Sequence, residues 1–257
     1  MTPKEAFDDI IARAQLCLDL HVGLIDVRRR GIRSDWKESF CGLMHWPKGS
    51  NIERVDSRDA VVVLRDGCKL TRSSFRKEAL EELLRSALVV AVSALDRYVH
   101  ERVVKKVVKA LSGKDLNRSQ RELAIPVSDA LRIQSTFRKA MRNNPNVRPA
   151  NEVRHILQES LHQRTFQSWS EIESAFELVG VNGLAGQIQA ARHAATIQPL
   201  KKQLGDIARR RNQIVHEGDL VRHRRGGQPK RHPVDRTYAK NSISFVQDLV
   251  DTLDKLV

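Results

Sequence analysis

Residues 208–219 of the chain read ARRRNQIVHEGD, which combines three arginines, a polar amide and a histidine with a strong helix stop. Upstream, Pro199 suits the first turn of a helix, because its missing N–H group costs nothing there. Gly218 fits the left-handed position that lies just past a helix end. The stretch therefore predicts one helix that runs from about residue 199 to residue 217.

One face of this predicted helix is apolar, since Leu200, Leu204, Ile207, Ala208, Ile214 and Val215 recur at helical spacing. At about 100° per residue, Arg211 falls near the middle of that face, Arg210 at its edge and Arg209 on the opposite side. A guanidinium that points at a core is unfavourable unless it is paired or faces a polar cleft. Arg211 is therefore the arginine that needs a partner or a function.

Asn212 and His216 are four residues apart and share another face of the same helix. The pKa of an unperturbed imidazole lies near about 6.5, so His216 can accept or donate a proton at neutral pH. The arginine at position 211 can hold a phosphate through two parallel contacts. A proton-transfer group beside a fixed cation can cleave RNA without a metal ion, because the 2′-OH of the substrate is the nucleophile.

The arginine–histidine spacing resembles the signature of the HEPN superfamily of ribonucleases, in which a polar residue often follows the arginine. Three blocks in order resemble one branch, the RiboL-PSP-HEPN family. They are residues 93–99 (SALDRYV), residues 165–168 (TFQS) ahead of 172–176 (IESAF), and residues 211–219 (RNQIVHEGD). The resemblance covers about residues 73–257. It implies a helical bundle, and members of the superfamily are commonly dimers in which two arginine–histidine pairs face one cleft.

The resemblance implies roles for four residues. His216 is expected to act as general base or acid, Arg211 to bind the scissile phosphate, and Asn212 to orient the phosphate or the imidazole. Asp96 has two interpretations, a surface charge that pairs with a neighbouring base or a carboxylate that holds Arg211 in a buried pair. Arg209 is a rival to Arg211, because it shares the face of Asn212 and His216.

Charge supports a nucleic-acid partner. The chain has 257 residues with 45 basic and 31 acidic side chains, a formal net charge of +14, which favours a polyanion. An anionic membrane surface is the competing partner. As a separate point, no apolar run approaches the ~20 residues that a helix needs to cross a membrane. The residues expected to contact RNA lie on the predicted helix and in the basic segment after it: Arg209, Arg210, Arg222, Arg224, Arg225, Lys230 and Arg231.

The pattern along the chain predicts a mainly α fold. Residues 1–72 are expected to form a small mixed α/β extension, with a helix over 4–29 and a β-hairpin in which residues 61–64 pair with 68–70 across Asp66-Gly67. Residues 73–257 are expected to form the HEPN-like ribonuclease domain. It begins with a long helix over 73–113 and a polar loop over 114–125. Further helices are expected over 126–142, 149–164, 171–179, 184–195 and 235–256. A Ser170–Glu173 capping box is expected to open the helix over 171–179, and the last helix is expected to bury Tyr238.

Two spacings allow a metal site. Cys17 with His21, and Cys41 with His45, are each four residues apart and together could supply four zinc ligands. The better interpretation places Cys17 and His21 in an apolar helix stripe, where a lone cysteine behaves as a small hydrophobe. No metal or cofactor is therefore predicted. The three dispersed cysteines indicate a reducing compartment, and the cytoplasm is expected.

The function expected from the sequence is that of a metal-independent endoribonuclease. It would be a bacterial toxin or an anti-phage defence effector, acting on RNA as a homodimer and accompanied by an antitoxin or another defence protein. The alternative is a non-catalytic RNA-binding or assembly module, in which Arg211 pairs with Asp96 and His216 only caps a helix. A helical scaffold for protein partners is a third interpretation, and it leaves the charge of +14 without a purpose.

Overall fold

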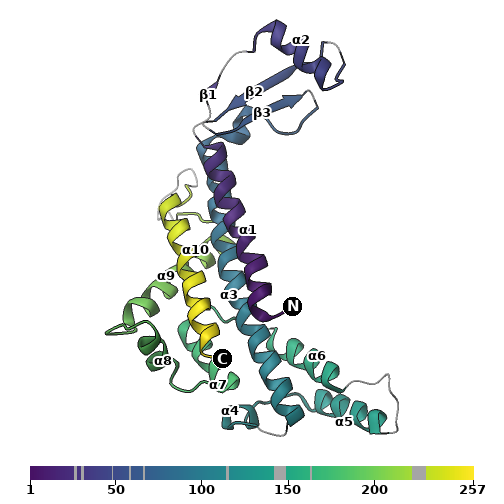
Figure 1. Cartoon of the computed structure of the whole chain (residues 1–257), viewed down its shortest axis with the longest axis vertical. Coiled ribbons are helices and arrows are strands. Elements are labelled where there is room, and N and C mark those ends of the chain that lie inside the picture. Colours follow the sequence, from purple (N-terminus) through teal and green to yellow (C-terminus); the bar gives the residue numbers. More distant parts are fainter. Residues whose placement is uncertain are drawn as a thin grey trace.

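The computed structural model describes residues 1–25, 28–29, 32–47, 49–57, 59–65, 67–113, 116–141, 149–162, 164–221 and 230–257. The fold is mainly α-helical, as the sequence predicts, and Figure 1 shows an elongated molecule. The helices are α1 (Pro3–Leu24), α2 (Ser34–Leu43), α3 (Lys77–Gly113), α4 (Arg118–Arg121), α5 (Val127–Met141), α6 (Pro149–Leu161), α7 (Trp169–Val179), α8 (Leu184–Ala191), α9 (Gln198–Glu217) and α10 (Arg236–Lys255). The strands are β1 (Arg28–Arg29), β2 (Ile52–Asp56) and β3 (Val61–Arg65), and a 3-10 turn η1 (Arg72–Phe75) precedes α3.

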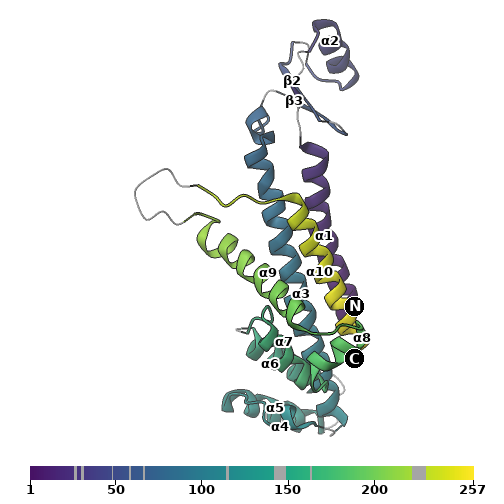
Figure 2. The ribbon, with the colours of Figure 1, turned by 90° about the vertical axis from the view of Figure 1, so that its left-hand side faces the viewer.

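Helix α3 is the axis of the fold. Its 37 residues make it about 55 Å long at a rise of about 1.5 Å per residue. The apolar repeat that predicts this helix is the repeat that becomes buried: Leu80, Leu84, Ala87, Leu88, Ala91, Leu95, Tyr98, Val99, Val103 and Val107. Helices α1, α6, α7, α9 and α10 all contact it, and Figure 2 shows α9 crossing it obliquely.

Helix α1 packs along α3 over most of its length. Phe7, Ile11, Ala14 and Leu18 are buried in the same hydrophobic core as the apolar residues of α3. The ring of Phe7 meets the ring of Tyr98 edge to face, with 6.2 Å between centroids. Although α1 precedes the segment assigned to the main domain by sequence, it supplies part of that domain's core.

Helix α10 packs on α3 beside α1, at the level of Tyr98. Tyr98 donates a hydrogen bond to the Asp254 carboxylate at 2.9 Å, and Arg102 forms an ion pair with the same carboxylate. Burial raises the pKa of the Tyr98 hydroxyl above its ordinary value, although the nearby Arg102 guanidinium opposes the shift. The hydroxyl therefore stays protonated and remains a donor to Asp254.

A small antiparallel sheet of order β1-β2-β3, together with α2, lies beyond one end of the α1–α3 pair. A hairpin is present in this region, but the predicted pairing was wrong: β3 pairs with β2, with Val62 opposite Val55, and not with residues 68–70. The reason is burial, because Val55 and Leu64 can be covered while Cys68 and Lys69 stay exposed. Gly67 adopts a positive φ of 85° and turns the chain toward α3.

Aromatic and arginine side chains hold α2 to this sheet. The rings of Trp36 and Phe40 stack at 4.9 Å, and Trp46 meets Phe40 edge to face. From the sheet, Arg54 lies over Trp36 and Arg65 lies over Trp46, at 5.5 and 5.6 Å from the ring centroids. Such cation–π contacts supplement a core too small to hold α2 by apolar burial alone.

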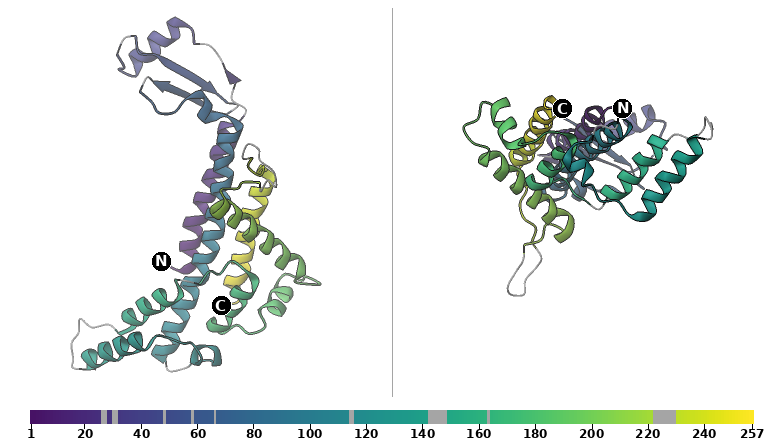
Figure 3. Two further views of the ribbon diagram at one scale, coloured as in Figure 1. Left: turned by 180° about the vertical axis from the view of Figure 1, so that it is seen from behind. Right: turned by 90° about the horizontal axis from the view of Figure 1, so that it is seen from below.

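The other end of α3 carries α5 and α6, which Figure 3 shows side by side, and the short helix α4, which contacts α7. The polar loop predicted over 114–125 was wrong in part, since Asn117 caps the short helix α4 there. The Ser170–Glu173 capping box was also wrong: α7 begins two residues earlier than predicted, at Trp169, with Ser168 as its N-cap. Gly180, with a φ of 99°, ends α7 where the sequence predicts.

A search of the described residues found no helix with the length and apolar content needed to cross a membrane.

Candidate active site

The predicted site helix is α9, and its end is formed by two successive left-handed residues. Gly218 is the C-cap, with a φ of 60°, and Asp219 follows with a φ of 61°. The Asp219 N–H donates to the Gln213 carbonyl at 3.0 Å, which satisfies a carbonyl left over at the helix end. The chain therefore reverses directly after His216.

The two halves of α9 differ in burial. Leu200, Leu204 and Ile207 are buried, and no residue of α9 beyond Ile207 is. Val215, which was predicted on the apolar face, is 46% exposed, so that part of the prediction was wrong. Ile214 is only partly buried. The half of α9 that carries the candidate site is thus packed less tightly than the half before it.

The structure brings Arg211 and Asn212 together. Nη1 of Arg211 donates to Oδ1 of Asn212 at 3.1 Å, while Nε of Arg211 is buried without a hydrogen-bond partner among the described residues. Arg211 is half-buried, and Asn212 and His216 are exposed. The arginine therefore does not enter the core that the apolar pattern suggested, because α9 has no buried residue at this level.

Arg209 lies in the open. Its side chain is 71% exposed and pairs with Asp206, one turn earlier, at 3.1 Å. An exposed pair of this kind contributes little to stability, so the guanidinium can be redirected to another anion at small cost. Both candidate arginines therefore have donors that a phosphate can reach, and Arg211 is the one that contacts Asn212.

Asp96 lies in a different environment from the one proposed for it. Its Oδ1 accepts a hydrogen bond from the Phe166 N–H, and its Oδ2 lies 3.8 Å from Nδ1 of His100. The His100 ring packs edge to face on Phe166, with 4.5 Å between centroids. No contact with Arg211 is present among the described interactions of Asp96. The carboxylate instead ties the segment before α7 to α3.

We expect Asp96→Ala to lower the free energy of unfolding by about 1–3 kcal/mol, because the Phe166 N–H loses its acceptor in a partly buried place. Asp96→Asn, which keeps an acceptor oxygen, should lose less. Urea denaturation followed by circular dichroism measures both. Unchanged stability of the alanine variant combined with a loss of RNA cleavage would instead restore the role of Asp96 as the holder of Arg211.

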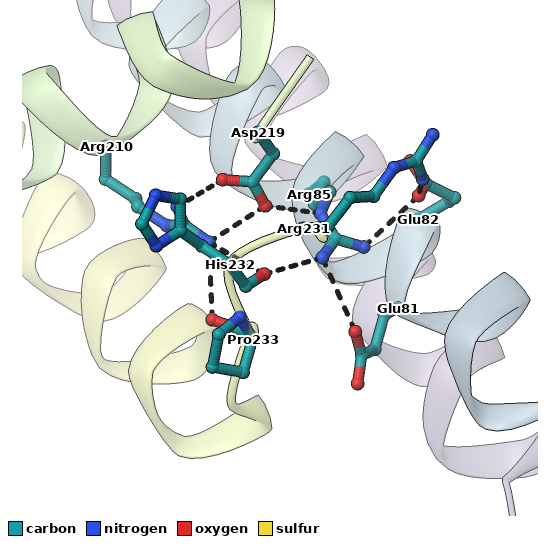
Figure 4. A network of polar contacts seen from close by, with 8 residues as sticks. All are labelled: Glu81, Glu82, Arg85, Arg210, Asp219, Arg231, His232 and Pro233. Atoms are coloured by element: carbon teal, nitrogen blue, oxygen red, sulfur yellow. Dashed lines mark hydrogen bonds and ion pairs between the residues drawn. The ribbon is translucent and has the colours of Figure 1, made fainter. Parts of the chain in front are cut away.

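Arg210 and Arg231, both predicted to contact RNA, are held in a polar network (Figure 4). Arg210 forms a two-pronged pair with Asp219, in which its Nη2 lies 2.9 Å from Oδ2. Arg231 pairs with Glu82 on α3. Arg210 is mostly covered and its guanidinium is engaged by a carboxylate, whereas Arg231 keeps an exposed side chain. Lys230 is exposed, and Arg222, Arg224 and Arg225 lie outside the described residues.

Two members of this network were not singled out from the sequence. Arg85 on α3 is 3% exposed, and its Nε donates to Oδ2 of Asp219 at 2.6 Å. Asp219 is 1% exposed. A signal for Arg85 was present, because a charge beside Leu84, Ala87 and Leu88 in an apolar repeat needs a buried partner. Nothing in the local sequence marks Asp219 as that partner, since 134 residues separate the two.

The two cysteine–histidine pairs with metal-ligand spacing lie on separate elements. Cys17 and His21 lie on α1, whereas Cys41 lies on α2 and His45 follows that helix. His21 and Cys41 are buried, and burial raises the pKa of the half-buried Cys17 thiol. Within the described parts of the chain, no three histidine, cysteine or acidic side chains gather as metal ligands would.

The fold and the site together define a class: a helical bundle in which one helix presents an arginine, an asparagine and a histidine near its C-terminal end. A family model described as RiboL-PSP-HEPN matches residues 66–257, and the chain belongs to this HEPN-domain family. The resemblance predicted from the three sequence blocks is thereby confirmed. No curated protein and no solved structure matches the chain. Membership of the family suggests a nuclease or RNA-related function.

Each of the three sequence blocks that resemble the family lies on helix α3 or contacts it. Asp96 of the first block contacts Phe166 of the second, which joins α3 to the segment before α7. Asp219 of the third block contacts Arg85, eleven residues before Asp96 on the same helix. The blocks thus share α3 as a common support, and only the third carries exposed residues suited to proton transfer.

Proposed function

We propose that the protein is a metal-independent endoribonuclease. The observation that carries the proposal is the C-terminal half of α9, where Arg211 donates to Asn212 and His216 is exposed on the helix face of Asn212. These residues fit the arginine–histidine signature that the resemblance implies, and they lie within the segment that the family model matches. The three side chains supply a cation, an orienting amide and a proton-transfer group.

In the proposed reaction, the 2′-OH of one nucleotide attacks the adjacent phosphorus atom and the 5′-oxygen of the next nucleotide leaves. One proton must be removed from the 2′-OH, and one must reach the leaving oxygen. His216 performs one of these transfers, and Arg211 stabilises the charge that develops on the phosphate oxygens. Asn212 orients the phosphate or the imidazole. The products are a 2′,3′-cyclic phosphate and a free 5′-OH.

The charge of the chain supports RNA as the substrate. The formal net charge is +14, and the side chains of Arg209 on α9 and of Lys230 and Arg231 before α10 are exposed. Contacts with phosphates would release counterions, so binding should weaken as salt increases. Arg222, Arg224 and Arg225 are proposed to add to these contacts.

The proposed assembly is a homodimer in which two copies of α9 face one cleft, as is common in the superfamily. The proposed setting is the cytoplasm, where the protein would act as a bacterial toxin or an anti-phage effector and would be restrained by an antitoxin or a defence-system partner. These proposals follow from the family and from the chemistry of RNA cleavage.

The test is incubation of a mixed pool of tRNA and mRNA with the protein in EDTA. We expect cleavage to persist in the chelator and to leave 2′,3′-cyclic phosphate and 5′-OH ends, because neither the nucleophile nor the acid–base group requires a metal. Mass spectrometry of the fragments identifies the ends. Cleavage that disappears in EDTA and returns with added Mg²⁺, leaving 5′-phosphate ends, would contradict the proposal.

A second candidate function is RNA binding without cleavage. The observation that favours it is the side chain of His216, which makes no hydrogen bond to any described residue, so none of the described groups fixes its ring. Under this alternative, RNA binding is tight at low salt and no fragments appear with any RNA in the pool. A gel-shift assay beside the cleavage assay separates the two functions.

A further inference from the structure

Apolar packing holds α9 less firmly beyond Ile207, because no later residue of the helix is fully buried and Ile214 is only partly buried against the core. The candidate site residues all lie in the remaining half. Apolar contacts alone would therefore leave the rotation of this half about its axis weakly determined. A polar cluster at the end of the helix supplies the missing constraint.

That cluster centres on the Asp219 carboxylate (Figure 4). Arg210 approaches it with both Nη atoms, and Arg85 donates from Nε at 2.6 Å. Nη2 of Arg85 also donates to the His232 carbonyl at 2.8 Å, and Nη2 of Arg210 to the Pro233 carbonyl at 3.3 Å. The cluster thus joins α3, α9, the turn after α9 and the segment before α10.

Among the described residues, the charges of the cluster balance. Three carboxylates, from Glu81, Glu82 and Asp219, face three guanidinium groups, from Arg85, Arg210 and Arg231. Pairing of this kind removes the large penalty of an isolated buried charge. It does not by itself make the fold more stable than apolar side chains of similar size would, because both partners lose their hydration.

The turn after α9 does not require an aspartate. Asp219 has a positive φ, a conformation that glycine adopts without strain and asparagine tolerates as well as aspartate. A charged residue at this buried left-handed position is therefore explained by its carboxylate and not by the backbone. The carboxylate is needed because it draws Arg210 inward.

Because the Arg210 side chain points toward Asp219, helix geometry determines the directions of the other side chains of α9. At about 100° per residue, Asn212, His216 and Arg209 lie roughly 160°, 120° and 100° away from Arg210 around the helix axis. All three are exposed, in agreement with this geometry. His216 is also only three residues before Asp219, so the anchor acts on the same turn of the helix.

We propose that Asp219 is a positioning residue, which through Arg85 and Arg210 sets the rotation of the C-terminal half of α9 and so presents Arg209, Asn212 and His216 to RNA. The proposal deepens the proposed endoribonuclease function and rests on it. It assigns Arg210 to the support of the site, not to contact with RNA. It predicts a loss of turnover with little loss of RNA affinity when the carboxylate is removed.

The test compares Asp219→Asn with Asp254→Asn in the full chain. Asp254 pairs with Arg102 between α3 and α10, so the control removes the same charge from an arginine pair between two helices of the same bundle. We expect Asp219→Asn to lower kcat about 10- to 100-fold, because small displacements of reacting groups have effects of this size, with KM changed less than about threefold. Asp254→Asn should leave kcat unchanged at temperatures where both variants remain folded.

A structural readout accompanies the kinetics. Hydrogen–deuterium exchange of residues 211–217 should become faster in Asp219→Asn and stay the same in Asp254→Asn. Wild-type kcat in Asp219→Asn, or an equal loss in both variants, would overturn the proposal. If Asp219→Asn does not fold, Arg85→Lys replaces it: a shorter lysine lacks the planar fork with which Nε and Nη2 of Arg85 reach Asp219 and the His232 carbonyl, so kcat should fall, and an unchanged kcat would overturn the proposal.

Failure of the proposed function remains distinguishable from failure of the positioning role. If the wild-type protein cleaves no RNA, the endoribonuclease function fails, and the exchange experiment alone then decides the positioning role. Unchanged exchange of residues 211–217 in Asp219→Asn would overturn it, whereas faster exchange confined to these residues would support it.

Discussion

Replacement of His216 by alanine is expected to reduce RNA cleavage by about 100- to 10,000-fold, the range in which a single acid–base group contributes to catalysis. No other histidine lies on the exposed half of α9, so another imidazole of the helix cannot take over the proton transfer. The measurement is the initial rate of fragment formation from one RNA, with wild type and variant at equal concentration in EDTA.

The fold should not change in His216→Ala. The side chain is exposed, so the free energy of unfolding is expected to stay within about 0.5 kcal/mol of the wild-type value. RNA affinity should also stay close to that of the wild type, because a neutral imidazole adds little to phosphate binding. Wild-type cleavage by a folded His216→Ala protein would remove this residue from the mechanism.

The second large effect is expected at Arg211. Arg211→Ala should lower kcat by about 100- to 1,000-fold, which is typical of the loss of one group that stabilises developing charge. Arg211→Lys should restore little, because an ammonium lacks the two-pronged geometry of a guanidinium. Stability should hardly change, because the substitution removes a buried Nε that has no hydrogen-bond partner among the described residues.

Arg209→Ala is the matched comparison for Arg211→Ala. Both substitutions remove one arginine from the same half of α9, but Arg209 is paired with Asp206 whereas Arg211 contacts Asn212. We expect Arg209→Ala mainly to raise KM by a few-fold, through the loss of a phosphate contact. Rates measured over a range of RNA concentrations separate the two effects. A larger fall in kcat for Arg209→Ala would exchange the roles of the two arginines.

Local signals in the sequence predicted the site helix well. Pro199 lies in the first turn of α9 and Gly218 at its C-cap, because both positions impose backbone requirements that few residues meet. The long helix α3 was predicted from its apolar repeat for the same local reason. Its length could be read directly because the repeat continues without a break.

Contacts between distant segments were not predictable in the same way. The interpretation of Asp96 as the partner of Arg211 was chemically reasonable, yet the carboxylate found a backbone N–H at Phe166 instead. The carboxylate that holds an arginine of α9 is Asp219, and the arginine is Arg210. Helical periodicity gives the side of a helix on which a residue lies, but not the element that faces that side.

Side-chain burial at helix ends was also misjudged. Tyr238 was expected to be buried in the last helix, but it lies in the first turn of α10 and is 36% exposed. Burial of part of its ring still raises the pKa of its hydroxyl, a shift that Arg210 and Arg209 oppose. Periodicity overestimates burial in such places, because the first turn of a helix extends past the elements that cover its middle.

The packing of α1 against α3 limits which fragments of the chain can be expected to fold. The family match begins at residue 66, yet Phe7, Ile11, Ala14 and Leu18 fill the core beside α3. A fragment that starts at residue 66 would leave a long apolar strip of α3 bare to water, and such a strip promotes aggregation. The smallest unit able to fold therefore includes the N-terminal helix, and the sheet with α2 is an insertion between the two paired helices of one body.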